Sequence, residues 1–464
     1  MEQAAKGRSS RVYAIGTDPV RMRAILEHHL QVPGGPSFEV VDCRPSFTRG
    51  REARSLFQYD VKLRDADGRE WNELVSGVAY GGQRTGKVWE KLKPADEDGP
   101  GELSIRRVAY VPDLDLILQV FPFDHGLPAL EPLMAGTLAG LAAPIMGRFG
   151  SGEWQLDQWQ SESVRYRVDL RASVRLTVRA KESHSGSVSE RRFFAKVYGG
   201  RDQAERAWTV QQDLAIAVRA ASAPFGLAPL VAYLPDARVL VQDEVQALSL
   251  PHIIRRADPE TVAEAVRRAA RAIAALHRLS ITAPEHRLEL DRTDPARLRR
   301  TADILRNSRP DLAGVVAEIE RQINDGLDAI GKLPAVPIHG DLKPAHVLLE
   351  EERVVLIDLD KFAAGEPMLD VTNLLMPLRR ERKTRLAGTS LARVFAKEYF
   401  AHVPPAWEQR LAPLYAWAVL SEATAFAASP RKNLPDVKNN RPQRREQRVD
   451  VLVEEARAML AGEA

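Results

Sequence analysis

IHGDLKPAH, at residues 338–346, and VLIDLD, at residues 355–360, decide the fold that we expect for this chain of 464 residues. The apolar run Val336–Ile338 predicts a short strand that leads into the first segment. The apolar runs within Val347–Ile357 flank a polar turn and predict a hairpin that ends at the second segment. The two leading aspartates, Asp341 and Asp358, would then both lie at strand ends, on one side of a cleft.

Two carboxylates in this arrangement suit phosphoryl transfer to a hydroxyl group. In the kinase pattern, a His-x-Asp loop supplies the aspartate that receives the hydroxyl, and a later aspartate holds Mg²⁺. Asp341 and Asp358 occupy those two places. The pattern has an asparagine five residues after the catalytic aspartate, whereas this chain has His346 there. The alternative interpretation is that both segments are ordinary hairpin turns, since Asp and Gly are common turn residues.

Together with Gly365-Glu366-Pro367 and Asp370, these motifs resemble the aminoglycoside phosphotransferase family, which shares the protein-kinase fold and phosphorylates small molecules. The resemblance implies that Asp341 is the catalytic base, with Lys343 touching the transferred phosphate. It implies that Asp358 binds Mg²⁺ together with His346 or Asp360. Asp370 would brace the loop rather than touch substrate.

The phosphates of ATP need a further positive charge, and the strand Arg192–Tyr198 predicts one at Lys196. Strand alternation places Lys196 on the same face as Phe194 and Tyr198. The helix expected at Asp202–Ala221 offers Glu205 as its partner, with Asp213 as an alternative; Glu205 would equally suit a helix N-terminus through the dipole.

Two further segments complete the expected nucleotide site. The turn Asp169–Ser173, between two alternating strands, is where a phosphate-covering loop is expected, although it lacks glycine. Downstream, the strand Val239–Gln246 predicts a hinge that would hydrogen-bond adenine through backbone groups around Glu244 and Val245.

Composition is consistent with a soluble enzyme, which we expect to be cytoplasmic, but it does not indicate an activity. A formal net charge of +3, from 66 basic and 63 acidic side chains, gives no indication of a nucleic-acid partner. The only cysteine, Cys43, excludes an intrachain disulfide. The N-terminus lacks an apolar signal core. The apolar stretch Leu133–Gly147 is shorter than the roughly 20 residues of a spanning helix, so it predicts a buried helix and no membrane segment.

An internal repeat relates the N-terminal region to the expected nucleotide site. VAYVPD at 108–113 matches VAYLPD at 231–236 at an offset of 123, and two Gly-Gly pairs recur at an offset of 118. When the Gly-Gly pairs are aligned, Val78 stands where the second copy has Lys196. The N-terminal region is therefore predicted to be a degenerate copy of the kinase small lobe, acting as a cap or regulatory module whose partner the sequence does not indicate.

We therefore expect an α+β, bilobal, protein-kinase-like fold, with an antiparallel small lobe, a mainly helical large lobe and an extra N-terminal α+β domain. The predicted domains are 1–155 for the N-terminal copy, 156–247 for the small lobe and 248–464 for the large lobe. The polar run Ser151–Gln160 would link the first two. Helices are expected at Val262–Leu279 and Leu411–Ala428, and Glu422 on the latter is a candidate for contacting a cationic acceptor.

These features predict an ATP- and Mg²⁺-dependent phosphotransferase that acts on a hydroxyl of a small molecule resembling an aminoglycoside, a sugar or an amino alcohol. Two alternatives remain open. A pseudokinase is favoured by His346 and by the glycine-free turn. A protein kinase is mildly favoured by Lys343, but only eleven residues separate Asp358 from Asp370, which leaves no room for a long activation segment.

Overall fold

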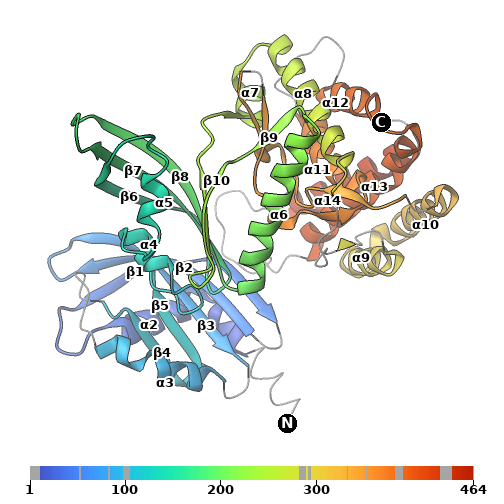
Figure 1. Ribbon diagram of the computed structural model, residues 1–464. Coiled ribbons are helices and arrows are strands. Elements are labelled where there is room, and N and C mark those ends of the chain that lie inside the picture. Colours follow the sequence, from blue (N-terminus) through green and yellow to red (C-terminus); the bar gives the residue numbers. More distant parts are fainter. Residues whose placement is uncertain are drawn as a thin grey trace. The chain divides into compact units, whose positions relative to one another are not determined.

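The chain divides into two compact units. The first comprises Met1–Trp208 and Pro229–Glu244, and the second comprises Thr209–Ala228 and Val245–Ala464. Figure 1 labels many of the chain's helices and strands. The structure, a computed structural model, describes residues 11–51, 54–81, 84–97, 105–281, 289–290, 294–331, 333–351, 353–381, 390–428 and 442–462.

The N-terminal sheet of the first unit has five antiparallel strands in the order β1-β2-β3-β5-β4. Its strands are β1 (Phe38–Arg51), β2 (Arg54–Asp65), β3 (Glu70–Tyr80), β4 (Val108–Val111) and β5 (Leu116–Val120), with helix α3 (Arg84–Glu97) between β3 and β4. Helix α2 (Pro19–Leu30) begins where the Asp18 side chain accepts hydrogen bonds from the Val20 and Arg21 N–H groups. Its apolar side chains are buried in one core cluster with the side chains of this sheet.

The second sheet of this unit has the order β10-β11-β8-β7-β6. Its strands are β6 (Trp154–Arg167), β7 (Arg171–Glu182), β8 (Val188–Tyr198), β10 (Leu230–Leu234) and β11 (Val239–Asp243), and helix α6 (Arg201–Ala220) follows β8. The short helices α4 (Leu130–Ala135) and α5 (Ala142–Met146) contribute Leu130, Leu133 and Ile145 to the core on one face of the sheet.

The two sheets have the same topology, because in each the third strand pairs with the fifth and a helix separates the third strand from the fourth. The pairing register also agrees with the sequence repeat. Val78 lies opposite Ile117 in the first sheet, and Lys196 lies opposite Leu240 in the second. Ile117 and Leu240 are related by the offset of 123. Val78 therefore occupies the place of Lys196, as the repeat predicted.

Side-chain packing repeats as well. Trp89 of α3 stacks on Tyr110 with ring centroids 5.6 Å apart, and Trp208 of α6 stacks on Tyr233 at 5.5 Å. The prediction that the N-terminal region is a second small-lobe-like domain is confirmed at the level of topology, register and packing.

Two expectations about the first unit are wrong. The stretch Leu133–Gly147 does not form one helix, because Gly136 adopts a left-handed conformation (φ 74°) that ends α4. The run Ser151–Gln160 is not a linker, since β6 starts at Trp154 and pairs with β7 along its length. β6 is an edge strand with many exposed side chains, so its sequence is polar and does not have the apolar pattern that predicts a strand. It crosses the predicted domain border at 155/156.

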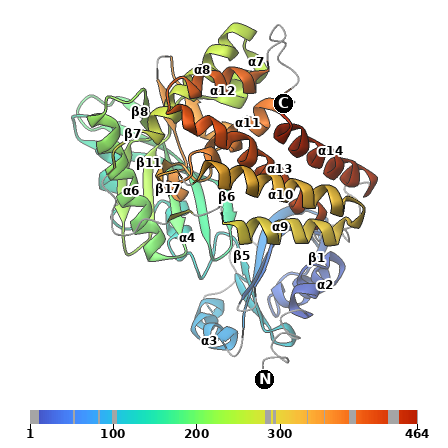
Figure 2. The same cartoon turned by 90° about the vertical axis from the view of Figure 1, so that its right-hand side faces the viewer.

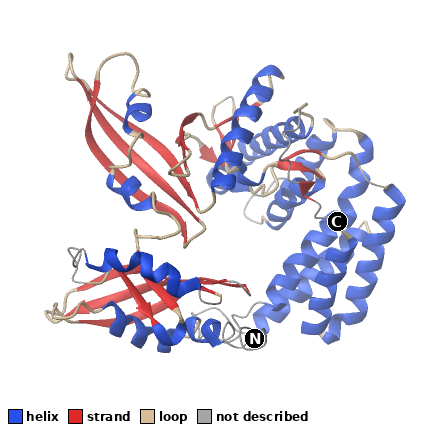
Figure 3. Ribbon diagram, turned by 60° about the horizontal axis from the view of Figure 1, so that its bottom comes forward, coloured by secondary structure: helices blue, strands red, loops and turns tan. Residues whose placement is uncertain are grey.

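The second unit is mainly helical, as Figures 2 and 3 show. Its helices include α7 (Leu250–Arg256), α8 (Pro259–His277), α9 (Pro295–Ser308), α10 (Ala313–Ile330), α11 (Met368–Arg380), α12 (Leu391–Phe400), α13 (Leu411–Ala428) and α14 (Pro442–Leu460). The predicted helix at Val262–Leu279 is confirmed as α8, which Asp258 caps. Helix α13 confirms the predicted helix at Leu411–Ala428. Pro405–Ala428 is long and apolar enough to cross a membrane, but half of its apolar window is buried, and Leu414 and Leu420 lie in the core of this unit.

Two small sheets carry the motif segments. One has the order β12-β15-β16-β9, with β12 at Leu248–Ser249, β15 at Val347–Leu349, β16 at Val354–Leu356 and β9 at Phe225–Leu227. The other has the order β13-β17-β14, with β13 at Glu289–Leu290, β17 at Ala363–Gly365 and β14 at Val336–Ile338. The predicted strand and hairpin are confirmed, whereas β17, which pairs back onto β14, was not predicted.

Gly126→Ala is expected to destabilise the first unit. A Cβ at Gly126 would lie 2.7 Å from Asp169 Cα in the turn between β6 and β7. Relieving this contact should cost about 1–3 kcal/mol of unfolding free energy, as overpacking does. Urea unfolding followed by tryptophan fluorescence measures the change.

Gly86→Ala is the matched control, because a Cβ at Gly86 in α3 meets no atom within 4 Å. This variant should be neutral or more stable by up to about 1 kcal/mol. Equal stability of the Gly126→Ala protein and the wild-type protein would contradict the packing described.

Candidate active site

The loop that carries Asp341 is fixed by one buried carboxylate. Asp370, near the start of α11, has no exposed surface. Its Oδ2 accepts a hydrogen bond from the His339 N–H at 2.6 Å, and its Oδ1 accepts one from the Gly340 N–H at 3.0 Å. Burial alone would raise the pKa of Asp370, but His277 and His339 hold it below its usual range. The prediction that Asp370 braces the loop agrees with this geometry.

His277 supports the carboxylate from α8. Its Nε2 lies 3.3 Å from Asp370 Oδ2, and its Nδ1 lies 2.7 Å from the Tyr399 hydroxyl. The imidazole is fully buried between them. His277 is therefore a packed core histidine, as expected, and it acts on the loop through Asp370.

Asp341 lies between two ammonium groups. Lys343 Nζ is 3.1 Å and Lys361 Nζ is 3.4 Å from Asp341 Oδ2. Partial burial raises the pKa of Asp341, but the two lysines outweigh that effect and lower it overall. Its side chain is 26% exposed. Asp341 is thus an ionised, accessible hydrogen-bond acceptor with two positive charges beside it.

Lys361 is the residue that sequence reasoning missed. It directly follows the VLIDLD segment, so a lysine three residues after Asp358 was the available signal. The pairing of Ala363 in β17 with Ile338 in β14 brings this part of the chain back to the strand that leads to Asp341. The sequence around Lys361 gives no indication that β17 and β14 pair.

Asp358 and His346 face each other at the end of the hairpin. His346 Nε2 is 3.6 Å from Asp358 Oδ2, and Asp358 adopts a left-handed conformation with φ 61°. The His346 ring stacks on His339 with centroids 5.3 Å apart. Burial, reinforced by His339, lowers the pKa of His346 to about 4, although Asp358 opposes the shift. His346 is therefore a neutral imidazole at physiological pH.

Mg²⁺ fits this site as an ion shared with phosphates. It prefers oxygen ligands and is commonly held by one or two carboxylates, phosphate oxygens and water. Asp358 and Asp360 offer such oxygens, whereas the His346 nitrogen is a less suitable donor. Among the residues that the structure describes, no three His, Cys, Asp or Glu side chains form a closed metal cage.

The expected nucleotide-binding residues lie mainly in the first unit. Lys196 is half-buried near the end of β8, paired with Ser173 and Leu240. Its strand neighbour Tyr198 packs with Ala204 and Ala207 of α6, so Lys196 lies on the face of the sheet that α6 covers. Glu205, its predicted partner, is exposed, which favours the helix-terminus alternative.

Glu244 continues the ladder of the second sheet. Its N–H donates to Arg192 O at 2.9 Å, and its side chain accepts a hydrogen bond from Arg175 Nε at 2.8 Å. This N–H is therefore already used, and adenine would have to meet other backbone groups of the predicted hinge. Val245 is the first residue of the following segment, which belongs to the second unit.

The expected phosphate-covering turn differs from the prediction. Arg171, Ala172 and Ser173 are part of β7, so the turn is only Val168–Leu170. Asp169 in this turn is 7% exposed and forms an ion pair with Arg54 of the N-terminal sheet at 2.7 Å. Glycine is absent because side-chain contacts, rather than a free backbone, determine the conformation of this turn.

Glu422 does not supply a free acidic group for a cationic acceptor. It accepts a hydrogen bond from Arg380 at 2.7 Å and lies 3.3 Å from Arg448. Its charge is therefore already balanced within the helical core.

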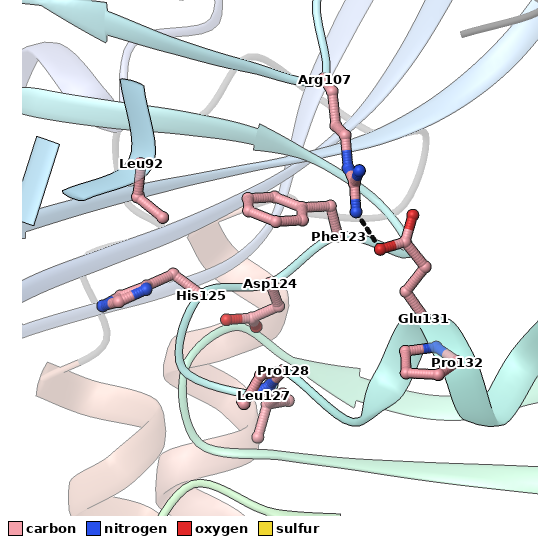
Figure 4. Close-up of a pocket in the computed structure, with 9 residues that line it drawn as sticks. All are labelled: Leu92, Arg107, Phe123, Asp124, His125, Leu127, Pro128, Glu131 and Pro132. Atoms are coloured by element: carbon pink, nitrogen blue, oxygen red, sulfur yellow. Dashed lines mark hydrogen bonds and ion pairs between the residues drawn. The ribbon is translucent and has the colours of Figure 1, made fainter. Parts of the chain in front are cut away.

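A cavity of about 380 Å³ lies in the first unit, beside the segment that follows β5. Figure 4 shows its nine lining residues, with Arg107 and Glu131 paired at one side. They are Leu92, Arg107, Phe123, Asp124, His125, Leu127, Pro128, Glu131 and Pro132. None of the predicted catalytic or nucleotide-binding residues lines it.

Residues 186–412 match the profile of the Phosphotransferase enzyme family. This segment, which is just under half of the chain, is similar to the enzymes of that family. It contains β8 with Lys196, the strand β11 where a hinge was predicted, and both motif segments, and it excludes the N-terminal sheet. The predicted family resemblance, the protein-kinase-like fold and the enzyme class, a phosphotransferase, are thereby confirmed.

Several solved structures are similar to the chain at low identity. A choline/ethanolamine kinase family protein from Mesorhizobium loti is 16% identical over 72% of this chain and 95% of its own, with a TM-score of 0.40. A macrolide 2'-phosphotransferase from Brachybacterium faecium is 17% identical over 69% and 97%, with a TM-score of 0.38. No curated protein matches the chain. The family match, rather than these similarities, carries the assignment.

In the phosphotransferase-like domain, Asp370→Asn is expected to loosen the loop. The side-chain NH2 group of the new asparagine would face the backbone N–H of either His339 or Gly340. That buried N–H would then have no hydrogen-bond acceptor. The cost should be about 2–4 kcal/mol of unfolding free energy. Urea unfolding of the purified protein measures it.

Asp325→Asn is the matched control for this substitution. Asp325 lies on α10, where it is 62% exposed and pairs with Arg321. Its loss should change stability by less than about 1 kcal/mol. If Asp370→Asn were as mild as Asp325→Asn, the buried carboxylate would not be what fixes the loop.

Proposed function

We propose that the chain is an ATP- and Mg²⁺-dependent phosphotransferase that phosphorylates a hydroxyl group of a small molecule. The observation that carries the proposal is the ionised Asp341 carboxylate, accessible and flanked by Lys343 and Lys361, next to the pair Asp358 and His346. All five residues lie in the second unit, on elements fixed by Asp370 and by strand pairing.

Asp341 would accept a hydrogen bond from the acceptor hydroxyl and aim its oxygen at the γ-phosphorus. The new O–P bond forms as the bond to the β,γ-bridging oxygen breaks, ADP leaves, and the hydroxyl proton passes to Asp341. Because its pKa is lowered, Asp341 is a weak base, so its main contribution is orientation. This suits a loose transition state, in which proton transfer is late.

Lys343 and Lys361 would stabilise the charge on the transferred phosphoryl group. Mg²⁺, when bound, would neutralise the negative charge on the β- and γ-phosphate oxygens. Asp358 is its proposed ligand, with Asp360 or His346 as the second. Lys196 would contact the α- and β-phosphates, and backbone groups around Glu244 and Val245 would hold adenine.

A small-molecule acceptor is supported by the short segment between Asp358 and Asp370. It is filled by a single 3-10 turn at Leu359–Lys361 and by β17, which pairs with β14. No stretch remains for a protein-binding activation segment. The chemical class of the acceptor is best found by a screen of hydroxyl compounds for ADP release.

Asp341→Asn and Asp358→Asn are expected to fail at different steps. Asp341→Asn should lower kcat by about 10²–10⁴-fold while ATP-Mg²⁺ still raises the melting temperature. Asp358→Asn should lose that thermal shift, because the ion that joins the phosphates to the protein loses its carboxylate. ADP release and differential scanning fluorimetry measure the two effects, and Asp325→Asn should behave like the wild-type protein in both. Full activity of the Asp341→Asn protein would remove Asp341 from its role.

A pseudokinase is the second candidate, favoured by the neutral, partly buried His346 where the kinase pattern has asparagine. His346→Asn tests it by supplying an amide oxygen, a better Mg²⁺ ligand. If the chain is an active enzyme adapted to histidine, the variant should lose activity. A wild-type protein that neither shifts in melting temperature with ATP-Mg²⁺ nor releases ADP, together with activity gained in the variant, would support the pseudokinase.

A further inference from the structure

The N-terminal sheet has lost the chemistry of a nucleotide site but keeps its shape. Val78 occupies the place of Lys196, on the face that α3 covers in the same way as α6 covers the second sheet. Leu56, paired with Val78, occupies the place of Ser173. This face therefore carries apolar side chains where the second sheet carries an ammonium group and a hydroxyl.

The turn Val168–Leu170 of the second sheet fills this apolar face. Val168 is fully buried in one cluster with Leu56 and Val78, and Leu170 packs against the same cluster. The side of the first sheet that would otherwise face a nucleotide is thus covered by a turn of its own duplicate.

Polar contacts with three residues, Tyr80, Arg54 and Asp124, fix the same turn. Asp169 Oδ2 accepts a hydrogen bond from the Tyr80 hydroxyl at 3.1 Å and pairs with Arg54 at 2.7 Å. The Asp169 N–H donates to Asp124 Oδ2 at 2.8 Å, which also accepts from the Tyr166 hydroxyl at 2.8 Å. Both carboxylates are at least nine-tenths buried.

These contacts determine an unusual backbone. Asp169 has φ 60°, a left-handed conformation that costs a non-glycine residue about 1 kcal/mol or more. On the far side, the Gly199 N–H donates to Leu170 O at 2.8 Å. A turn held on both sides cannot adjust as a glycine-rich loop does.

We propose that the N-terminal sheet positions the turn Val168–Leu170 for nucleotide binding. Tyr80 and Arg54 are the positioning residues. They hold the turn in one conformation over the phosphates, where protein kinases have a flexible glycine-rich loop. This inference rests on the proposed function, because the turn between the first two strands of a kinase small lobe is the one that covers the phosphates. The N-terminal copy then binds no nucleotide itself. It determines how the second copy holds one.

Tyr80→Phe and Arg54→Gln test the proposal with ATP and adenosine as probes. Each variant removes one contact to Asp169 and should raise the dissociation constant of ATP-Mg²⁺ about threefold to tenfold. Adenosine has no phosphates for the turn to cover, so its dissociation constant should stay within about twofold. Isothermal titration calorimetry of the full chain measures both.

Tyr110→Phe is the matched control. The hydroxyl of Tyr110, on the edge strand β4 of the same sheet, donates to Asp115 at 2.7 Å and not to a residue of the turn. Its loss removes an equivalent tyrosine–aspartate hydrogen bond and should leave both dissociation constants unchanged. If all three variants weakened ATP and adenosine alike, the N-terminal sheet would have only a general structural role and the proposal would be overturned.

Amide hydrogen exchange separates this proposal from the proposed function. The Asp169 and Leu170 amides should exchange at least tenfold faster in the Tyr80→Phe protein than in the wild-type and Tyr110→Phe proteins. Unchanged exchange overturns the positioning role, whether or not ATP binds. A wild-type chain that binds no ATP-Mg²⁺, with the exchange difference present, overturns the proposed function and the nucleotide part of the inference, and leaves only a fixed turn.

Discussion

The loop that carries Asp341 depends on the buried carboxylate of Asp370. A carboxylate without exposed surface is tolerated only if its charge is matched by donors, and here two backbone N–H groups and His277 supply them. The donors belong to His339 and Gly340, directly before Asp341. Gly340 has φ 78°, which glycine adopts without strain, so the loop can turn and present both N–H groups to one carboxylate. The position of Asp341 thus follows from satisfying a buried charge.

Electrostatics then determine what Asp341 can do. Two lysines from different segments converge on one of its oxygens, so the group stays ionised and is a poor proton acceptor. The same lysines are available to a phosphoryl group that arrives beside it. Preorganised charge of this kind is the main way in which proteins accelerate phosphoryl transfer, because little covalent chemistry is asked of the protein.

The first unit contains one sheet topology twice, with different side chains on the corresponding faces. Both sheets keep the strand order, the helix after the third strand and the tryptophan–tyrosine stack. Changing lysine to valine at one position, and serine to leucine opposite it, converts a polar face into an apolar one that must be covered. The covering element is a turn of the other copy, so the two sheets pack together within this unit.

Local patterns in the sequence determined the elements of this protein: the strand before Asp341, the hairpin that ends at Asp358, the helix α8, and the repeat that places Val78 where Lys196 stands. These features could be predicted because periodicity, turns and fixed spacing act over a few residues. The sequence left open the approach of Lys361 to Asp341, the neutralisation of Glu422 by two arginines, and the docking of Asp169 on Tyr80 and Arg54. Each of these joins segments far apart in the chain, and only the pairing of strands and the burial of charge in the folded structure decide which distant side chains meet.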